Sequence, residues 1–210
     1  MDKRAAFIGL FLLLAAPAQA SSLTVTLLNQ KSAGVGEAVV TFTPAGGEGV
    51  PITGKPADPL TVNQRDLTFM PFISVVPRNT QVSFLNEDSV LHHVFSFSPI
   101  KRFSLKLFGT DETQSVVFDE PGVVVVGCNI HDNMIAYLKV VDTPFAGKTD
   151  ADGSFTLEGL PPGPGQLTVW HPLMKGRGNQ LTAEVVIGPD GQALEFKKKF
   201  RRGARPVGDY

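Results

Sequence analysis

The stretch "VVVVGCNIHDNM", residues 123–134, contains the residues on which the rest of the interpretation depends. Four valines lead into Cys128, the only cysteine in a chain of 210 residues, and His131 and Met134 follow at intervals of three. A run of β-branched residues predicts a strand, and the polar residues after it predict a loop. We therefore interpret the stretch as a buried strand that delivers a thiol to a loop with an imidazole and a thioether.

The composition of the chain limits the class of protein. Hydrophobic residues make up 42% of the sequence and charged residues 19%, which excludes a disordered chain. The formal net charge of −1 argues against a nucleic-acid partner. The length is enough for one or two domains with their own cores.

The first twenty residues have the pattern of an export signal. Lys3 and Arg4 give a basic start, an apolar run follows from Ala5 to Ala16, and Ala18-Gln19-Ala20 resembles a cleavage site. The apolar run is too short to span a bilayer. We predict that residues 1–20 are a cleaved signal peptide, that the protein is periplasmic with secretion as the alternative, and that it has no transmembrane anchor.

Export makes a single cysteine unusual, because exported proteins tend to pair their cysteines in disulfides. A lone thiol after export is buried and inert, paired with another molecule, or occupied by a ligand. Two histidines and one cysteine in a plane, with a weak axial methionine, select copper and suit one-electron transfer. Cys128, His131 and Met134 supply three of these four side chains. The second histidine must come from another part of the chain.

Short apolar runs continue along the whole sequence. Glycine occurs 21 times and proline 16 times, and they separate runs rich in Val, Thr, Phe and Leu that predict strands. The expected strands are "SLTVTLL", "AVVTFTP", "TQVSFLN", "HHVFSFS", "QSVVFD", "GVVVVGC", "IAYLKVV", "GSFTLEGL", "QLTVWH" and "LTAEVVIG". We predict an all-β protein built from sandwiches of short strands.

The missing histidine is available in "VSFLNEDSVLHHVFSFS", residues 82–98. Together with this segment, residues 67–141 resemble the cupredoxins, the family of plastocyanin, amicyanin and pseudoazurin. The resemblance rests on four motifs in the family's order: Phe84-Leu85-Asn86, His92-His93-Val94, Phe118-Asp119-Glu120-Pro121-Gly122, and the amicyanin-like spacing of Cys128, His131 and Met134. Met70-Pro71-Phe72 fits the opening strand of that fold. The resemblance implies a Greek-key β-sandwich over residues 56–141 that binds one type 1 copper ion.

The resemblance also implies a role for each site residue. The metal ligands would be His92, Cys128, His131 and Met134, and Asn86 would tie the ligand loops together near the cysteine. The spacing from Asn86 favours His92 as the upstream ligand, with His93 as a hydrogen-bonded neighbour or a surface residue. Strand alternation points the other way, because Leu91, His93, Phe95 and Phe97 form the more apolar face. Val126 stands where cupredoxins often have an aromatic residue.

The two flanks of this segment resemble a carboxypeptidase-regulatory-like, or transthyretin-like, β-sandwich. The motifs are "AVVTF", "TDADGSF" and "GLPPG". The resemblance implies a discontinuous domain of residues 21–55 and 142–196 with the copper domain inserted, and a row of small domains is the alternative. We interpret residues 150–153 as a hairpin turn rather than a calcium loop. His171 is expected to be structural.

The end of the chain, residues 197–210, is rich in lysine and arginine. Such runs are usually solvated tails, and we predict one here. The alternative is contact with an acidic partner or with an anionic membrane surface.

These observations favour an exported electron carrier that is not an enzyme, since no G-x-S-x-G, phosphate-loop or HExxH motif occurs. Its partners would be redox proteins, such as a cytochrome or an amine dehydrogenase, because chains of similar texture are labelled methylamine-utilisation proteins. In the family the loop histidine exposes a ring edge within an apolar patch, and here Ile130, Asn133, Pro71 and Phe72 are expected around it. The alternatives are a copper carrier or sensor, and a non-metal binding protein with a degenerate copper site.

Overall fold

The computed structural model describes residues 21–47 and 60–201. The predicted signal peptide and residues 202–210 of the predicted tail lie outside the described residues. Within the described part, the regular structure is β-strand apart from one 3-10 turn, Arg177–Asn179, so the predicted all-β class is confirmed. No helix in the described ranges is long and apolar enough to cross a membrane.

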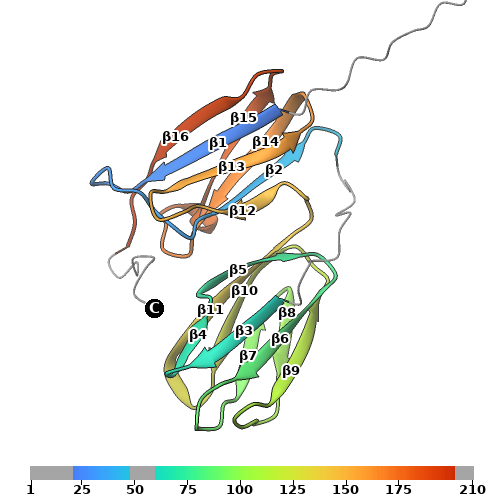
Figure 1. Ribbon diagram of the computed structural model, residues 1–210, viewed down its shortest axis with the longest axis vertical. Coiled ribbons are helices and arrows are strands. Elements are labelled where there is room, and N and C mark those ends of the chain that lie inside the picture. Colours follow the sequence, from blue (N-terminus) through green and yellow to red (C-terminus); the bar gives the residue numbers. More distant parts are fainter. Residues whose placement is uncertain (1–20, 48–59, 202–210) are drawn as a thin grey trace, which may run out of the picture.

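One sandwich, called here the flanking sandwich, is built from both ends of the chain (Figure 1). Its first sheet has the order β13-β1-β16, with β13 (Ser154–Leu160), β1 (Ser21–Leu28) and β16 (Gln192–Lys197). Its second sheet has the order β12-β2-β14-β15, with β12 (Ala146–Lys148), β2 (Val39–Pro44), β14 (Gly163–Trp170) and β15 (Gln180–Ile187). In β1 every second residue is buried, as expected for a strand with one face on a core. The N-terminal and C-terminal flanks therefore share one hydrophobic core.

The other sandwich, the central sandwich, contains the strands between these flanks. Its larger sheet has the order β5-β11-β10-β7-β8, with β5 (Ile73–Pro77), β11 (His131–Val141), β10 (Gly122–Cys128), β7 (Val94–Ser98) and β8 (Lys101–Ser104). The smaller sheet has the order β4-β3-β6-β9, with β4 (Thr68–Met70), β3 (Leu60–Arg65), β6 (Thr80–Asn86) and β9 (Thr113–Phe118). The strand β11 ends at Val141, where the predicted central segment ends, whereas the predicted boundary near residue 55 lies outside the described residues.

The valine run forms β10, but the strand is buried on one face only. Val124 and Val126 are fully buried, while Val125 is 39% exposed. The run of four valines suggests burial on both sides, yet the outer face of this sheet is not covered at Val125. Alternation along β10 still brings Cys128, four residues after Val124, to the inner face, where it is 5% exposed.

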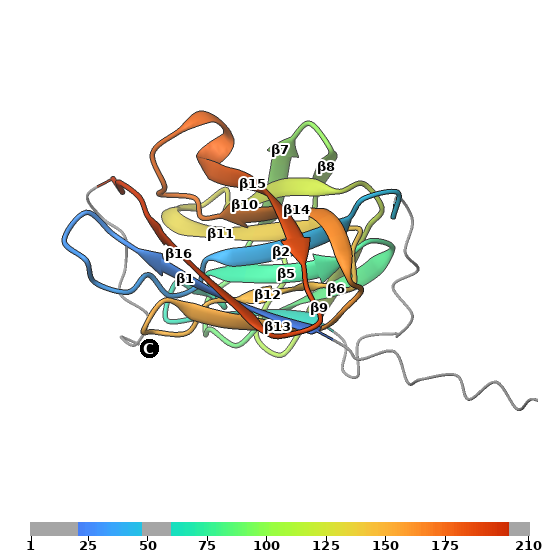
Figure 2. The same ribbon diagram turned by 90° about the horizontal axis from the view of Figure 1, so that it is seen from above.

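A small apolar group, called here the junction cluster, joins the two sandwiches. Val39 of β2 and Trp170 of β14 pack with Ile73 of β5, and the Tyr137 ring lies 6.0 Å from the Trp170 ring between centroids. Lys148 Nζ crosses the junction by donating hydrogen bonds to Glu37 Oε1 at 2.7 Å and to the Ile73 carbonyl at 2.9 Å. Figure 1 shows β5 as the strand of the central sandwich next to the flanking sandwich, and Figure 2 shows the two sandwiches from above.

The start of the predicted basic tail is part of the flanking sandwich. Lys197 is the last residue of β16, and the Lys198 N–H donates to the Leu28 carbonyl at 2.9 Å. Phe200 is 6% exposed and belongs to the core of this sandwich. Packed structure therefore continues to Arg201 rather than ending at residue 196.

Candidate metal centre

Two sequence-predicted ligands lie on either side of a tight connection. The strand β10 ends at Cys128 and β11 begins at His131, with Asn129 and Ile130 between them. The register shifts at Gly127 and Cys128, so that Cys128 pairs directly with His131. This irregularity lets the thiol and the imidazole lie beside each other at the end of the sheet.

The upstream histidine reaches the same point from the loop that follows β6. His92 forms an isolated bridge with Phe108, in which each backbone N–H donates to the other's carbonyl at 3.1 Å. Its side chain is fully buried. The backbone of His92 is thus held in place by pairing with the backbone of Phe108.

The three donor atoms have the spacing of a metal site. Cys128 Sγ lies 3.6 Å from His92 Nδ1 and 3.6 Å from His131 Nδ1. The donor atoms of the three residues all lie within 4.8 Å of one another. Donors about 2.1 Å from one ion, in a plane at about 120° to each other, would be separated by about 3.6 Å. The donor set and its spacing therefore fit a copper ion bound by one thiolate and two imidazoles.

Met134 enters the same core from β11. It is 2% exposed and packs in the buried cluster that contains Cys128. Its position, three residues after His131 on β11, places a thioether close to this end of the sandwich. It is the residue that could act as the axial ligand.

His93 is not part of the cluster. Its ring is half-buried, and its Nε2 lies 2.7 Å from Ser104 Oγ. Strand alternation predicted that the apolar face with Leu91, His93 and Phe97 points inward. This face points outward, since Leu91 is 51% exposed and Phe97 is 77% exposed. His92, Val94 and Ser96 point inward instead. The hydrophobic alternation therefore gave the wrong face, and the spacing from Asn86 pointed to the histidine that lies beside the thiol.

Asn86 is fully buried and stabilises the loop that carries His92. Its Nδ2 donates to the Val90 carbonyl at 2.8 Å and to the Phe108 carbonyl at 3.0 Å, and its Oδ1 accepts from the Asp88 N–H at 2.8 Å. These bonds lie within the upstream loops rather than at the cysteine. The link between the two ligand loops is made by backbone, since the Asn129 N–H donates to the His93 carbonyl at 3.0 Å.

Asp88 is a site residue that the sequence interpretation missed. Its Oδ2 lies 2.7 Å from His92 Nε2, the ring nitrogen that faces away from the thiol. Burial alone would raise the pKa of Asp88, but hydrogen bonds from His92 and from the backbone of Leu67 and Asp66 outweigh it and lower the pKa. The carboxylate is thus kept ionised beside the imidazole. The feature of the sequence that could have indicated Asp88 is its position between Asn86 and His92.

Cys128, His92 and Asp88 also have the order of a hydrolase triad, with a thiol, an imidazole and a carboxylate. Two observations favour a metal site. A second imidazole, that of His131, lies at the same distance from the sulfur as the first. The thiol is also only 5% exposed and packs in the buried core of the sandwich.

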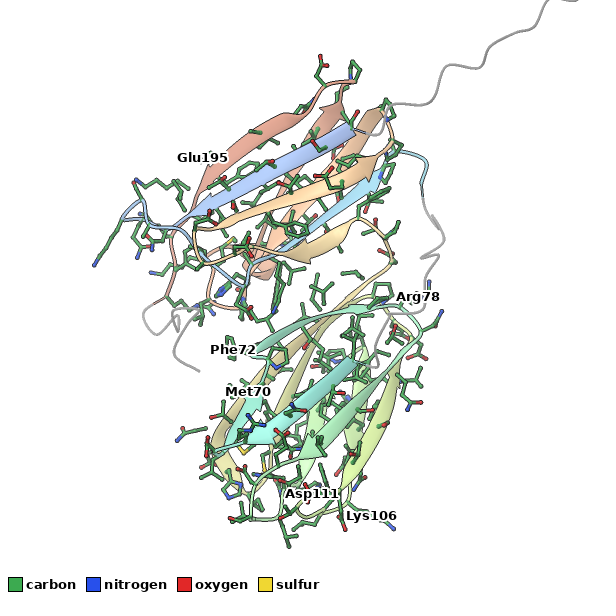
Figure 3. All side chains as sticks on the ribbon, in the orientation of Figure 1. Met70, Phe72, Arg78, Lys106, Asp111 and Glu195 are labelled. Atoms are coloured by element: carbon green, nitrogen blue, oxygen red, sulfur yellow. The ribbon has the colours of Figure 1, made fainter. Side chains whose placement is uncertain are left out.

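Exposed apolar side chains surround this end of the central sandwich. They come from four separate loops and are each about half exposed: Leu67, Val90, Leu91, Leu107 and Ile130. The expected neighbour Phe72 lies elsewhere, with its ring 5.3 Å from that of Tyr137 in the junction cluster. Figure 3 shows Phe72 and Arg78 next to the flanking sandwich and Lys106 and Asp111 at the opposite end. The Asp111 N–H donates to the Asn86 carbonyl at 2.7 Å, and Asn86 in turn holds the loop that carries His92. The candidate centre is therefore at the same end as Asp111.

His171, the fourth histidine, lies in the flanking sandwich. It is 4% exposed, its Nδ1 accepts from the Leu173 N–H at 3.2 Å, and its ring lies 5.4 Å from that of Phe200. Burial lowers its pKa to about 4. These contacts agree with the structural role expected for it.

Neither a protein-family model nor a curated protein sequence matches the chain. Among solved structures, amicyanin from Paracoccus versutus is similar at 18% identity, over 48% of this chain and 98% of that one, with a TM-score of 0.38. A purple cupredoxin from Nitrosopumilus maritimus is similar at 22% identity, over 39% of this chain and 99% of that one, with a TM-score of 0.37. A copper-containing nitrite reductase from Thermus scotoductus is similar at 26% identity, over 47% of this chain and 26% of that one, with a TM-score of 0.38.

Proposed function

We propose that the protein is an exported cupredoxin that binds one type 1 copper ion and carries single electrons between redox proteins. The observation that supports this most directly is the spacing of Cys128 Sγ from the Nδ1 atoms of His92 and His131, at 3.6 Å each. A thiolate and two imidazoles at such distances are the equatorial ligands of a blue copper site. Copper bound there would supply a one-electron couple.

The protein's own contribution is to keep the donors in place. Cys128 ends a strand that is paired on both sides, by β11 and by β7. His92 is held between the Phe108 backbone and the Asp88 carboxylate. Donors on rigid elements move little between oxidation states, so little rearrangement accompanies gain or loss of an electron.

The surroundings of His131 suit contact with a redox partner. Its side chain is half-buried, unlike that of His92, and the exposed apolar residues on the neighbouring loops form a surface around this end of the sandwich. Small and largely apolar contacts are suited to brief encounters between electron carriers. A cytochrome or an amine dehydrogenase in the periplasm is the class of partner proposed.

The flanking sandwich is proposed to be a carboxypeptidase-regulatory-like domain that supports the copper domain. The predicted turn at residues 150–153 supports this family, because Gly153 has φ of +86° and its N–H donates to the Asp150 carbonyl at 2.9 Å. Since this sandwich packs at the end away from the candidate centre, its proposed role is structural or in docking rather than in metal binding.

The proposed function is tested by adding copper(II) to the purified protein. We expect an intense blue colour and the narrow copper hyperfine splitting of a type 1 site, both lost in Cys128→Ser because the thiolate causes them. His93→Gln is the matched control and should retain both, since His93 contacts Ser104 and not the cluster. A blue Cys128→Ser protein would refute the assignment. Ready loss of copper to a chelator, with poor redox cycling, would indicate a copper carrier instead.

A further inference from the structure

The Asp88 carboxylate receives hydrogen bonds from several directions and is largely shielded from solvent, with 11% of its side chain exposed. Its Oδ1 accepts from the Asp66 N–H at 2.6 Å, and its Oδ2 accepts from the Leu67 N–H at 3.2 Å and lies 2.7 Å from His92 Nε2. The backbone of Asp88 is fixed as well, because its carbonyl accepts from Thr110 Oγ1 at 2.7 Å. A carboxylate held this firmly has a defined position relative to the imidazole.

The two backbone donors come from a strained turn. Asp66 and Leu67 connect β3 to β4 and have φ of +51° and +53°, the left-handed region that a two-residue hairpin turn requires at both positions. Aspartate tolerates this conformation, as asparagine and glycine do, but a bulky leucine is unfavourable there. The turn nevertheless aims two successive N–H groups at Asp88. Strain that is retained in this way is characteristic of a functional site.

The carboxylate determines which nitrogen of His92 is free to bind a metal. A neutral imidazole has one N–H and one lone pair, and an acceptor on Nε2 places the proton there. The lone pair is then on Nδ1, the atom that lies 3.6 Å from Cys128 Sγ. A carboxylate on the far nitrogen also makes the imidazole a stronger donor.

The charge has a second effect, which concerns redox equilibrium. Copper(II) carries one more positive charge than copper(I), so a fixed negative charge one imidazole ring away stabilises the oxidised state more. With 11% of its side chain exposed, the carboxylate is only partly screened by solvent and salt.

From these contacts we propose that Asp88 is a positioning residue that holds His92 in the tautomer with the proton on Nε2, and that its charge lowers the reduction potential of the bound copper. The proposal rests on the proposed copper function. It assigns to the turn of Asp66 and Leu67 the role of holding this carboxylate against His92.

The test compares two variants that each remove one negative charge. In Asp88→Asn the amide oxygen can still accept from His92 Nε2, while the negative charge and the hydrogen bond from the Asp66 N–H are lost. The control is Asp132→Asn, since Asp132 is exposed, adjacent to the ligand His131, and its side chain has no hydrogen bond or ion pair within the described residues. We expect both variants to stay blue and only Asp88→Asn to raise the midpoint potential clearly in voltammetry. Equal shifts in the two variants would overturn the proposal.

A second measurement needs no variant and no copper. In ¹⁵N NMR of the metal-free wild-type protein, Nε2 of His92 should carry a proton, because the Asp88 carboxylate lies 2.7 Å from it. A ring protonated on Nδ1 alone would overturn the proposal even if Asp88→Asn failed to fold. A wild-type protein that binds no copper would overturn the proposed function together with the effect on potential. A blue protein whose midpoint potential does not change in Asp88→Asn would overturn only the proposal about Asp88.

Discussion

His92 and His93 are neighbours in the chain with opposite environments. The His92 ring is fully buried between Cys128 and Asp88, whereas His93 is half-buried and contacts Ser104 at the surface. The spacing from Asn86 indicated the histidine that lies beside Cys128, and the loop between Asn86 and His92 has a fixed hydrogen-bonded form. Hydrophobic alternation failed here because the outer face of β7 is not covered, so Phe97 is in solvent.

His171 makes stability depend on pH. Burial lowers its pKa to about 4, against about 6.5 in the unfolded chain, so the unfolded state binds a proton at a higher pH than the folded state does. The stability that this neutral histidine contributes is present above pH 6.5 and is lost as the pH falls towards 4, by up to about 3 kcal/mol. Urea unfolding between pH 7 and pH 4 measures this loss in the wild-type protein.

The matched variant for this measurement is His171→Asn, which keeps an acceptor near the Leu173 N–H and has no titratable group. Carboxylates titrate equally in both proteins, so the difference between the two curves isolates His171. We expect the free energy of unfolding of the variant to fall less over this range. Parallel curves would show that the burial of the ring does not control its protonation.

At the scale of single elements, the predicted strands were those with runs of β-branched and aromatic residues. The strands that were not predicted are β3, β4, β5, β8, β12 and β16. Apart from β5, they have short, mixed or charged sequences, such as "KRFS" in β8. All of them except β3 lie at sheet edges, and each is paired with a neighbouring strand. Pairing is a tertiary contribution, so local propensity could not reveal these strands.

The connection between β1 and β2 depends on the turn that precedes β13. A Cβ atom on Gly34 would lie 2.1 Å from the carbonyl oxygen of Asp152, which belongs to backbone and cannot move aside easily. We expect Gly34→Ala to lower the free energy of unfolding by about 2 kcal/mol, because the turn must shift. Thermal unfolding measures the loss, and Gly188→Ala is the control, since a Cβ there meets only a side-chain amide at 3.6 Å.

Gly34 and Asp152 both lie in the flanking sandwich, away from the candidate centre. The copper-dependent colour of Gly34→Ala should equal that of the wild type at a temperature where both are folded. An unchanged melting temperature would mean that the two turns do not pack as closely as the structure places them.

Across the whole molecule, the candidate centre and the junction cluster lie at opposite ends of the central sandwich. The exposed apolar loops are at the free end, and β5 lies next to the flanking sandwich (Figures 1 and 3). This arrangement leaves the loop of His131 accessible to a partner protein. The residues of the junction cluster, which hold the two sandwiches together, are therefore separate from the residues that would bind copper.

Trp170 is the residue that tests this separation. It is 2% exposed in the junction cluster and packs against Tyr137, so Trp170→Ala should cost about 3 kcal/mol or more through the cavity it creates. The blue absorption and the midpoint potential should stay at their wild-type values. A clear change in potential with the fold intact would contradict the separation, because it would couple the junction to the centre.

By itself, the sequence determined the all-β class and most of the strands, and it indicated the residue types of the candidate donor set. Those features depend on local composition and on short spacings such as Cys128, His131 and Met134. Only the tertiary structure decided the distances between Cys128 Sγ and the two imidazoles, the outward face of His93, and the contact of Asp88 with His92. Each of these depends on how separate strands pair and how loops from different strands meet, which no local pattern encodes.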